Sequence, residues 1–497
     1  MSSVLGIDLG TSSVKAMLLD TGTGESAVAG REYTVDIPQA GYAEQSPEVW
    51  WQATIAVLRE LKEKHSSRYA DIAAIGFSGQ MHGLVAVDES GVPLRPAIIW
   101  LDQRPTKQLD DIAKRISPEE LGRVLHNRVF AGFALPSLLW VLENEPDIAY
   151  RIYRVMQPKD YIRFKMTGCI GTEESDASAT GCFDTGKRDW AWEILQRFCV
   201  PPEIFPACGK SAEIAGTVTS ECAALTGLTR GIPVVYGSGD QTAQSIGNGA
   251  VREGMVISNI GTGGQISTFS STDKYDPQMR THTFCHAIEG AYTIFGATLC
   301  AGMSVNWLKN KVLGVNSYGV MNQLATEVPA GSEGLLFLPY LSGERAPHMN
   351  PKAEGMFFGL KLCHGQGHLI RAAMEGVTFS LKDSLCILEE MGICTDRIIA
   401  SGGGAASPVW LQIQADIFEK EIQVCRVGEQ ACLGACILAG VGAGLFASVQ
   451  DACRQFVQYE DRMIEPIQEN SRIYRREYER FKELYTRNKD LMGLSLK

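Results

Sequence analysis

The sequence predicts an α/β protein built from two similar domains. A strand, a loop of glycine and hydroxyl residues and a second strand occupy residues 3–20, and the same unit returns at residues 255–269, about half the chain away. A unit that recurs once in each half indicates internal duplication. The 497 residues are also too many for one ordinary hydrophobic core. We therefore expect two domains, residues 1–247 and 248–497.

The composition excludes several classes of protein. Hydrophobic residues make up 45% of the chain and charged residues 21%, and the net charge is −11. This negative charge argues against nucleic acid and against a membrane surface as partners. We find no run of about 18 apolar residues and no signal-peptide pattern before the first strand. The 14 cysteines are scattered, which favours a reduced, cytoplasmic protein.

The first repeat joins the strands VLGIDLG and VKAMLLD through Gly10-Thr11-Ser12-Ser13. Several N–H and O–H groups in one concave loop suit an anion such as phosphate. Asp8 lies at the end of the first strand, where a carboxylate could hold hydrated Mg²⁺ against that phosphate. An ordinary hairpin is the alternative interpretation.

The elements between the two repeats end in polar side chains. Ser46-Pro47-Glu48 starts an amphipathic helix that continues to residue 64, and strands are predicted over residues 72–77, 84–87 and 97–100. Side chains suited to hydroxyl recognition follow the first and third of these strands: Gln80, His82, Asp102 and Arg104. For His82 alone, a loop histidine without contact to a substrate is the alternative.

A short apolar strand over residues 232–236 leads into a glycine-rich stretch that contains Asp240. Open α/β sheets place their chemistry just past strand ends. We therefore expect Asp240 on a tight loop in a functional site. The alternative is a glycine-rich turn with a solvated carboxylate.

The second repeat, MVISNI-GTGG-QISTF, begins a half with several predicted elements. These are helices over residues 299–308, 368–391 and 470–490 and strands over residues 335–338 and 397–400. Gly402-Gly403-Gly404 follows the last strand and precedes a helix with Ser407 as its N-cap. Backbone at such a point can lie flat against a nucleotide. We expect the aromatic face of the last helix to dock on the body of the protein.

Three local patterns do not fit their usual functions. Residues 181–188, GCFDTGKR, approach a P-loop, but Arg188 replaces the hydroxyl that binds the metal. Gly22-Thr23-Gly24 closes a hairpin instead of opening a dinucleotide-binding helix. Two histidine groups lack a CxxC partner, so we expect structural histidines instead of zinc ligands: His282, Cys285 and His286, and His364 and His368.

Six segments, taken together and in order, resemble the FGGY family of carbohydrate kinases over residues 4–443: DLGTSS, SGQMHG, GDQ, IGTGG, GERAP and SGGGAASPVW. The resemblance implies two ribonuclease-H-like domains of the actin and Hsp70 ATPase type, with an active-site cleft between them. Within the family, residues 79–83 and 100–104 are similar to those of xylulokinases. Gluconate kinases also carry a Met-His pair, whereas glycerol kinases carry Arg-Glu there.

The resemblance implies a role for each matching residue. Asp240 corresponds to the general base and Asp8 to the acidic residue near Mg²⁺, with both near the cation, directly or through water. The implied ATP contacts are Gly10, Thr11, Ser12, Gly261, Thr262, Gly263, Gly302, Asn306, Gly403, Gly404 and Ser407. The implied sugar contacts are Gln80, Met81, His82, Trp100, Asp102, Arg104, Asp240 and Gln241. Xylulokinases usually have Asn where Gln241 stands, which leaves the ketose open.

The activity implied by the resemblance is ATP-dependent phosphorylation of a ketopentose, first of all D-xylulose to D-xylulose 5-phosphate. Its partners would be the sugar, ATP and Mg²⁺, and a homodimer is compatible with the sequence. A kinase for ribulose or gluconate is one alternative. An actin- or Hsp70-like ATPase is an alternative of another class, and a catalytically silent sugar sensor is a third.

Overall fold

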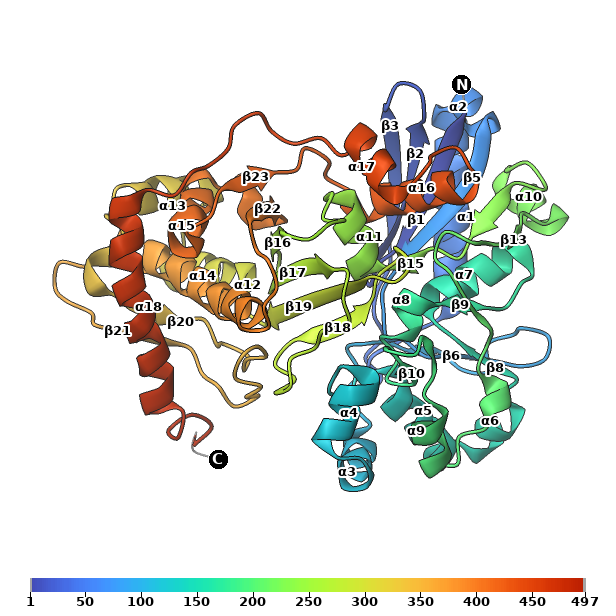
Figure 1. Cartoon of the computed structure of the whole chain (residues 1–497), viewed down its shortest axis with the longest axis horizontal. Coiled ribbons are helices and arrows are strands. Elements are labelled where there is room, and N and C mark those ends of the chain that lie inside the picture. The colour runs from blue at the N-terminus through green and yellow to red at the C-terminus, as the bar shows by residue number, and fades with distance from the viewer. Residues whose placement is uncertain (1, 495–497) are drawn as a thin grey trace.

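The computed structural model describes residues 2–494 and contains two large β-sheets (Figure 1). The first sheet has the strand order β13-β14-β5-β1-β2-β3, and β15 also pairs with β5. Its strands are β1 (Ser3–Leu9), β2 (Ser13–Asp20), β3 (Ser26–Glu32), β5 (Ile72–Gly79), β13 (Ile214–Thr217), β14 (Pro233–Val235) and β15 (Ser238–Gly239).

The second sheet has the strand order β18-β19-β17-β16-β22-β23. Its strands are β16 (Met255–Ile260), β17 (Gly264–Ser270), β18 (His282–Cys285), β19 (Tyr292–Thr298), β22 (Arg397–Ser401) and β23 (Ile422–Val424). Shorter strand pairs lie outside both sheets: β4 (Glu44–Gln45) with β7 (Ala97–Ile98), β6 (Val85–Val87) with β8 (Arg154–Met156), β9 (Thr172–Glu173) with β12 (Cys208–Gly209), β10 (Phe183–Asp184) with β11 (Asp189–Trp190), and β20 (Leu336–Leu338) with β21 (Met356–Phe358).

The two sheets repeat one design. In the first, β1, β2 and β3 are antiparallel neighbours, and β5 and then β14 add in parallel beside β1. In the second, β16, β17 and β19 are antiparallel neighbours, and β22 and then β23 add in parallel beside β16. The duplication predicted from the repeated hairpin is therefore confirmed. The boundary near residue 247 stays a prediction.

The first sheet lies between two layers of helices. On one face the core is formed with α1 (Pro47–Lys64), α7 (Pro158–Thr167) and α10 (Ser220–Thr226), where Trp50 and Leu58 are fully buried. On the other face lies α16 (Gln430–Gly442), packed against β1 and β5. Gly6 and Gly76 permit this approach, because a Cβ on either would overlap the backbone of α16.

Helix α16 also packs along α11 (Asp240–Gly247), and both lie between the two sheets (Figure 1). The helices meet backbone to backbone, because a Cβ on Gly434 would overlap Ala243 and one on Gly247 would overlap Gln430. One core cluster joins residues of the two sheets through these helices and α17 (Val449–Phe456). Cys432 and Cys436 are buried in it, as the small-residue pattern predicts.

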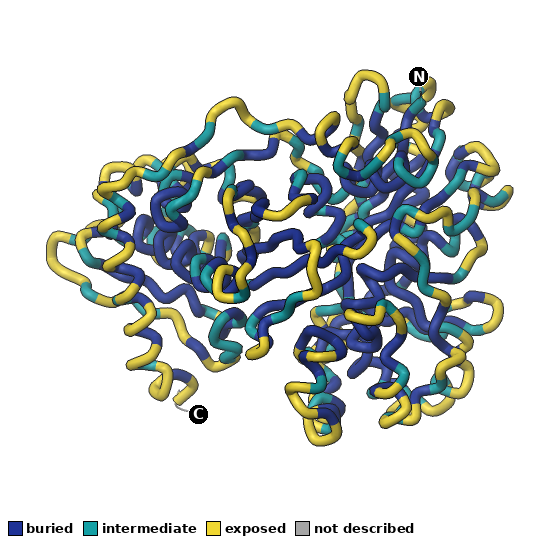
Figure 2. Tube along the Cα trace, viewed as in Figure 1, coloured by how far each residue is buried: buried dark blue, intermediate teal, exposed yellow. Residues whose placement is uncertain are grey.

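The second sheet is covered by α14 (Gln366–Glu390), and α15 (Pro408–Phe418) and α13 (Tyr318–Thr326) pack against α14. Its last layer is α18 (Gln468–Asn488), at the far end of the molecule from the first sheet (Figure 1). Tyr474, Tyr478, Phe481 and Tyr485 are buried in this core, so the predicted docking of the terminal helix is confirmed. Figure 2 shows the central strands β1 and β5 of the first sheet, the strands of the second sheet and most of α14 mainly in the colour of buried residues.

A further helical region follows β7 and carries its own apolar core (Figure 1). Its helices are α3 (Thr106–Arg115), α4 (Pro118–Leu125), α5 (Ala134–Asn144), α6 (Pro146–Arg151), α8 (Glu174–Ala177) and α9 (Trp192–Arg197). The sequence predicts only mixed helix and loop for most of this region.

Most predicted elements are present, with shifted ends. The helix predicted from residue 299 begins later, as α12 (Gly302–Trp307), and continues as a π-helical segment, Leu308–Leu313. Within residues 2–494, none of the helices is both long and apolar enough to cross a membrane.

Candidate active site

The parallel strands of the first sheet bring three polar strand ends together. Asp8 on β1 lies beside Ser78 on β5, and Ser238 on β15 lies on the other side of Ser78. The Ser78 hydroxyl donates a 2.6 Å hydrogen bond to the Asp8 carboxylate. Burial raises the pKa of Asp8 above its usual value, while this hydrogen bond and Lys15 act in the opposite direction.

Asp240 follows β15 directly and is the first residue of α11. The prediction of a tight loop is wrong in this detail, because the chain enters the helix without an intervening loop. Burial raises the pKa of Asp240 to about 7, and the nearby Asp8 carboxylate raises it further, while hydrogen bonds with Gln241 lower it. The two carboxyl groups are therefore close enough to influence one another.

Both hairpin loops present free backbone donors. In the part of the chain that the structure describes, the N–H groups of Thr11, Ser12, Thr262 and Gly263 have no protein acceptor. Each loop is closed by one backbone hydrogen bond: from Gly10 to Ser13 at 2.9 Å in the first, and from Gly261 to Gly263 at 3.0 Å in the second. Each loop is thus a small nest of N–H groups, as an anion requires.

Thr11 connects the first loop with the sugar-side residues. Its hydroxyl oxygen accepts a 2.8 Å hydrogen bond from the indole of Trp100 and keeps its own hydrogen to donate. Its carbonyl accepts from the Gln45 side chain at 2.7 Å, and Gln45 in turn accepts from Gln80 at 3.0 Å. Sequence reasoning missed Gln45, because it lies just before the predicted helix cap and belongs to no motif.

Met81 packs against Gly239, the residue before Asp240, and its neighbour His82 is held by separate contacts. A Cβ on Gly239 would come within 2.9 Å of Met81 Cγ, so glycine is needed beside the methionine. His82 has a positive φ of 72°, stacks on Phe133 with ring centroids 4.4 Å apart, and donates from Nδ1 to the Ala179 carbonyl at 2.5 Å. Because that carbonyl can only accept, Nε2 is left as an acceptor. Burial lowers the pKa of His82 to about 4, so the ring is neutral near pH 7.

Asp102 and Arg104 are paired with each other. The Asp102 carboxylate accepts from the Ala43 N–H at 2.7 Å and from the Arg104 guanidinium at 2.7 Å. Arg104 also binds Glu44 at 2.7 Å and lies 3.8 Å from the ring centroid of Tyr42. Their side chains are 0% and 1% exposed, so the pair is fully enclosed in the loop that follows Trp100.

Gly10, Thr11 and Ser12 lie in the loop of the first sheet, whereas the other residues predicted to hold ATP follow strands of the second sheet or lie on the helices beside them. β16 and β22 are parallel neighbours, so the loops at residues 261–263 and 402–404 follow adjacent strand ends. The Thr262 carbonyl accepts from the N–H groups of Ala301 and Met303 at the start of α12. Ser407 caps α15 as predicted, accepting from the Trp410 N–H at 3.3 Å. Gly403 and Asn306 are exposed, and Asn306 donates to the Tyr318 hydroxyl at 2.9 Å.

The GERAP segment contributes a cation that the sequence does not assign. Among residues 2–494, Arg345 has no ion pair, and burial lowers its pKa. Its charge lowers the pKa values of His82 and His282, so it lies near both rings. Its neighbour Glu344 is buried, with a pKa of about 7, and accepts from the Leu299 N–H at 3.0 Å. Arg345 lies in one of the six segments that carry the family resemblance, but the sequence alone does not show that it is unpaired.

The two histidine groups that we expect to be structural, and not zinc ligands, lie in different surroundings. His282 contacts the Asn127 amide oxygen at 3.1 Å, and His286 accepts from the Ile288 N–H at 3.0 Å. His364 lies near Glu333 and Cys363, within 4.8 Å measured between potential ligand atoms. Its Nδ1 accepts a hydrogen bond from the Lys361 N–H at 3.2 Å.

The chain matches known proteins over nearly its whole length. Residues 3–247 match the N-terminal domain, and residues 256–443 the C-terminal domain, of the FGGY family of carbohydrate kinases. Xylulose kinase of Lactococcus lactis is 38% identical over 493 residues, covering 99% of this chain and 98% of the relative. Gluconokinase of Bacillus subtilis is 32% identical over 489 residues, covering 95% and 94%.

The fold also matches solved structures. The crystal structure of xylulose kinase from Rhodospirillum rubrum superposes with a TM-score of 0.91 at 31% identity, covering 98% of this chain and 99% of that chain. The predicted α/β fold of two ribonuclease-H-like domains is thereby confirmed. The matches include both domains of the family and nearly the whole length of these relatives. This chain belongs to the FGGY family of carbohydrate kinases.

Proposed function

We propose that this kinase transfers the γ-phosphoryl group of ATP to D-xylulose and forms D-xylulose 5-phosphate, with Asp240 as the general base. The similarity to xylulose kinases over the full chain supports the choice of sugar. The structural observation that carries the proposal is the position of Asp240, whose carboxyl lies near Asp8 while Met81 packs on the turn before it.

A base at this position has the right acidity. A general base works best when its pKa lies near the operating pH, and burial raises the pKa of Asp240 to about 7. Asp240 would take the proton of the sugar hydroxyl as that oxygen attacks the γ-phosphorus. Such a role typically contributes about 10²–10⁴ in rate.

Charge stabilisation would come from the two nests. The free N–H groups of Thr11, Ser12, Thr262 and Gly263, together with the Thr11 hydroxyl, are donors for phosphate oxygens. Phosphoryl transfer depends mostly on such positioning and charge neutralisation. We propose that Gly302, Asn306, Gly403, Gly404 and Ser407 complete the ATP site along the edge of the second sheet.

Asp8 and Asp240 fit a magnesium ion. They are two neighbouring carboxyl groups, each with a raised pKa, and Ser78 is the one side-chain hydroxyl bonded to Asp8 among the described residues. Carboxylate oxygens are the ligands that Mg²⁺ uses in nucleotide sites, often through water. We propose that Asp8 holds the ion, with Asp240 beside it. When bound, Mg²⁺ neutralises negative charge on the phosphates.

We propose that Gln80, Met81, His82, Trp100 and Gln241 line the sugar site. The neutral His82 ring offers Nε2 as an acceptor for a sugar hydroxyl. Asp102 and Arg104 would act from behind this surface, because their polar atoms are engaged with each other and with neighbouring residues. Their proposed role is to fix the loop that carries Trp100.

Gluconate is a second candidate substrate, favoured by one observation. Arg345 has no ion pair among residues 2–494, yet it lies close enough to His82 to affect its pKa. A sugar-acid carboxylate would supply the missing partner. A neutral ketose would use the same guanidinium only for hydrogen bonds.

The choice is tested by ADP release in a coupled assay over D-xylulose, D-ribulose, L-ribulose, gluconate and glycerol. We expect the highest kcat/KM with D-xylulose, by at least about tenfold, since even the two ribuloses, which differ from it at one hydroxyl-bearing carbon, would lose a hydroxyl contact. A higher kcat/KM with gluconate that falls selectively in Arg345→Met would instead establish the second candidate. Equal, low turnover with every sugar would contradict both.

A further inference from the structure

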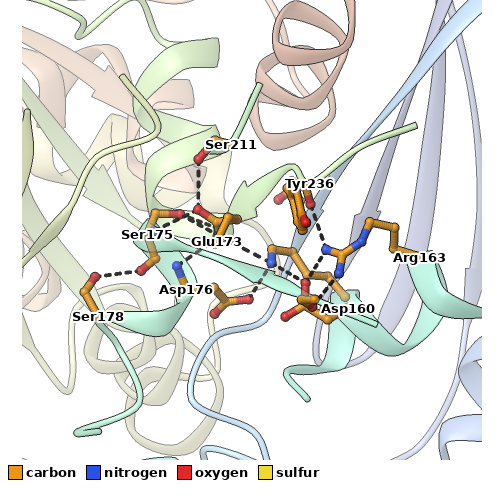
Figure 3. Close-up of polar contacts among 12 residues, drawn as sticks. Asp160, Arg163, Glu173, Ser175, Asp176, Ser178, Ser211 and Tyr236 are labelled. Atoms are coloured by element: carbon orange, nitrogen blue, oxygen red, sulfur yellow. Dashed lines mark hydrogen bonds and ion pairs between the residues drawn. The ribbon is translucent and has the colours of Figure 1, made fainter. Parts of the chain in front are cut away.

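A buried group of charged residues contacts the chain at Tyr236 (Figure 3), at the start of the turn from Tyr236 to Gly239 that leads into Asp240. We call it the Lys159 cluster, and it consists of Lys159, Asp160, Arg163, Glu173 and Asp176, all 0% exposed. Lys159 Nζ contacts Asp160 at 2.8 Å, Asp176 at 3.0 Å and Glu173 at 3.3 Å. Arg163 contacts Asp160 at 2.5 Å.

The cluster is close to electrically neutral. Burial raises the pKa of Asp176 to about 8, so this carboxyl keeps its proton near pH 7. Two cations then face the carboxylates of Asp160 and Glu173. Removing charged groups from water is costly unless they are paired and hydrogen bonded. A paired cluster of this kind holds its members in fixed positions.

Three backbone groups of the turn from Tyr236 to Gly239 are held by this cluster and its partners. The Gly239 N–H donates to Ser175 Oγ at 3.1 Å, and the Gly237 N–H donates to the Ser211 carbonyl at 2.9 Å. Arg163 donates to the Tyr236 carbonyl at 3.3 Å. Gly239 is the residue before Asp240, so its contact is the one nearest the proposed base.

Glu173 connects these contacts. Ser175 Oγ donates to one carboxylate oxygen of Glu173 at 3.0 Å, and Ser211 Oγ donates to the other at 2.8 Å (Figure 3). Ser175 therefore donates to the cluster and accepts from the turn through the same oxygen. Ser211 differs, because it meets the turn only through its backbone carbonyl.

The other end of the same segment contacts the sugar side and the second sheet. The Ala179 carbonyl accepts from His82, and the Ser178 hydroxyl accepts from the Cys285 N–H of β18 at 2.9 Å. Ser178 also donates to the Ser175 carbonyl at 2.9 Å. One short segment thus touches the Asp240 turn, a sugar-side residue and the neighbouring sheet.

We propose that Ser175 is a positioning residue for Asp240, fixing the start of α11 by linking the Gly239 N–H to Glu173. The inference rests on the proposed function of Asp240 as the general base. Loss of the Ser175 contact should slow the chemical step, because a displacement of the base by about 1 Å lowers the rate of proton transfer while the substrates still bind.

The test compares Ser175→Ala with the matched control Ser211→Ala. Each variant removes one buried hydroxyl bonded to Glu173, so both should lose similar thermal stability. Only Ser175→Ala frees the turn. We expect kcat to fall at least about tenfold in Ser175→Ala and less than about twofold in Ser211→Ala, with KM for sugar and ATP nearly unchanged in both.

A kcat loss of equal size in the two variants would overturn the proposal and leave Ser175 as an ordinary buried residue. If Ser175→Ala does not fold, Ser175→Cys replaces it in the comparison. Its side chain is close in volume to that of serine, but a thiol is a weak acceptor, so kcat should fall in this variant too. Asp240→Ala is measured in parallel. If Asp240→Ala stays active, the assignment of the base is wrong. If Asp240→Ala is inactive and the two serine variants lose the same fraction of kcat, only the role of Ser175 is contradicted.

Discussion

At the first position of α11, the acidity of Asp240 results from opposing effects. Burial and the Asp8 carboxylate favour the protonated form, whereas hydrogen bonds with Gln241 favour the charged form. The resulting pKa of about 7 gives a group that can take a proton from a hydroxyl and release it again. Gln241 therefore contributes to the acidity of Asp240.

Asp8 gives the first prediction at this scale. Asp8→Asn keeps an oxygen that can accept from Ser78 but removes the charge that we assign to Mg²⁺. We expect the Mg²⁺ concentration at half-maximal activity to rise at least about tenfold. Even residues that only bind a ligand of the metal typically change metal affinity by that factor. Asp20→Asn is the control, since Asp20 caps the turn at the far end of β2. Identical titrations for Asp8→Asn and the control would make Asp8 an ordinary strand residue.

The residues of the site differ in how far sequence reveals them. Asp8, Asp240 and the two loops stand at strand ends, where an apolar run followed by glycine and polar residues can be read locally. Lys159 and Glu173 carry no such sign, because pairing between residues distant in sequence decides that they are buried. For the same reason, the mutual pairing of Asp102 and Arg104 becomes evident only in the structure.

At the scale of elements, the hairpin loop at residues 261–263 is hydrogen bonded to the start of α12. The Gly302 N–H donates to the Gly261 carbonyl at 2.9 Å, and a Cβ on Gly302 would overlap that carbonyl oxygen. The sequence predicts Gly302 as a point of close approach by a ligand, and the structure shows that the loop itself approaches it.

Gly302→Ala should therefore displace the loop. We expect kcat/KM for ATP to fall at least about tenfold, because a shift near 1 Å removes the aligned donors. Gly319→Ala on α13 is the control, since the nearest atom to a Cβ there is Ser317 Oγ at 3.6 Å. A loss of stability without a change in kcat/KM for ATP would show that the loop does not contact the nucleotide.

The docking of α18 on α14 includes a carboxyl that resists ionisation. Burial raises the pKa of Asp383 from its ordinary value of 3.8 to about 7, although Tyr478 donates to it at 2.5 Å. Between these two pKa values the folded state keeps a proton that the unfolded state releases. Asp383 therefore lowers the stability of the fold as pH rises from about 4 to about 7, and its effect is constant above that range.

Asp383→Asn removes this dependence while keeping an acceptor for Tyr478. As the pH rises from 5 to 8, the wild type should lose free energy of unfolding relative to Asp383→Asn. We expect this relative loss to be on the order of 2 kcal/mol. Urea denaturation at several pH values measures it, with Glu479→Gln on the exposed side of α18 as the control. Parallel pH profiles for wild type and Asp383→Asn would contradict the raised pKa.

At the scale of the molecule, two copies of one sheet share a central pair of helices. Helix α11 carries Asp240 at its start and packs along α16, which lies on the first sheet close to Asp8. The glycine contacts between these helices fix their separation. The position of Asp240 therefore depends on residues from both halves of the chain.

The duplication is visible in the sequence because each copy keeps a hairpin with the same loop chemistry. The helical region from α3 to α9 is not, because its short helices are stabilised by a core of residues distant from one another in sequence. The sequence also predicts too early a start for the helix that contains α12, because Gly302 and the loop contacts at Thr262 delay its start. Local pattern thus predicts the repeated framework, and long-range packing decides the rest.

The most direct test of the proposed function is the turnover of Asp240→Ala with saturating ATP, Mg²⁺ and D-xylulose. We predict that both substrates still bind, by calorimetry, and that kcat falls at least about a hundredfold, the range expected for loss of a general base. A variant that retains more than about a tenth of wild-type turnover would contradict the assignment of Asp240, because loss of a base in this role costs at least about 10² in rate.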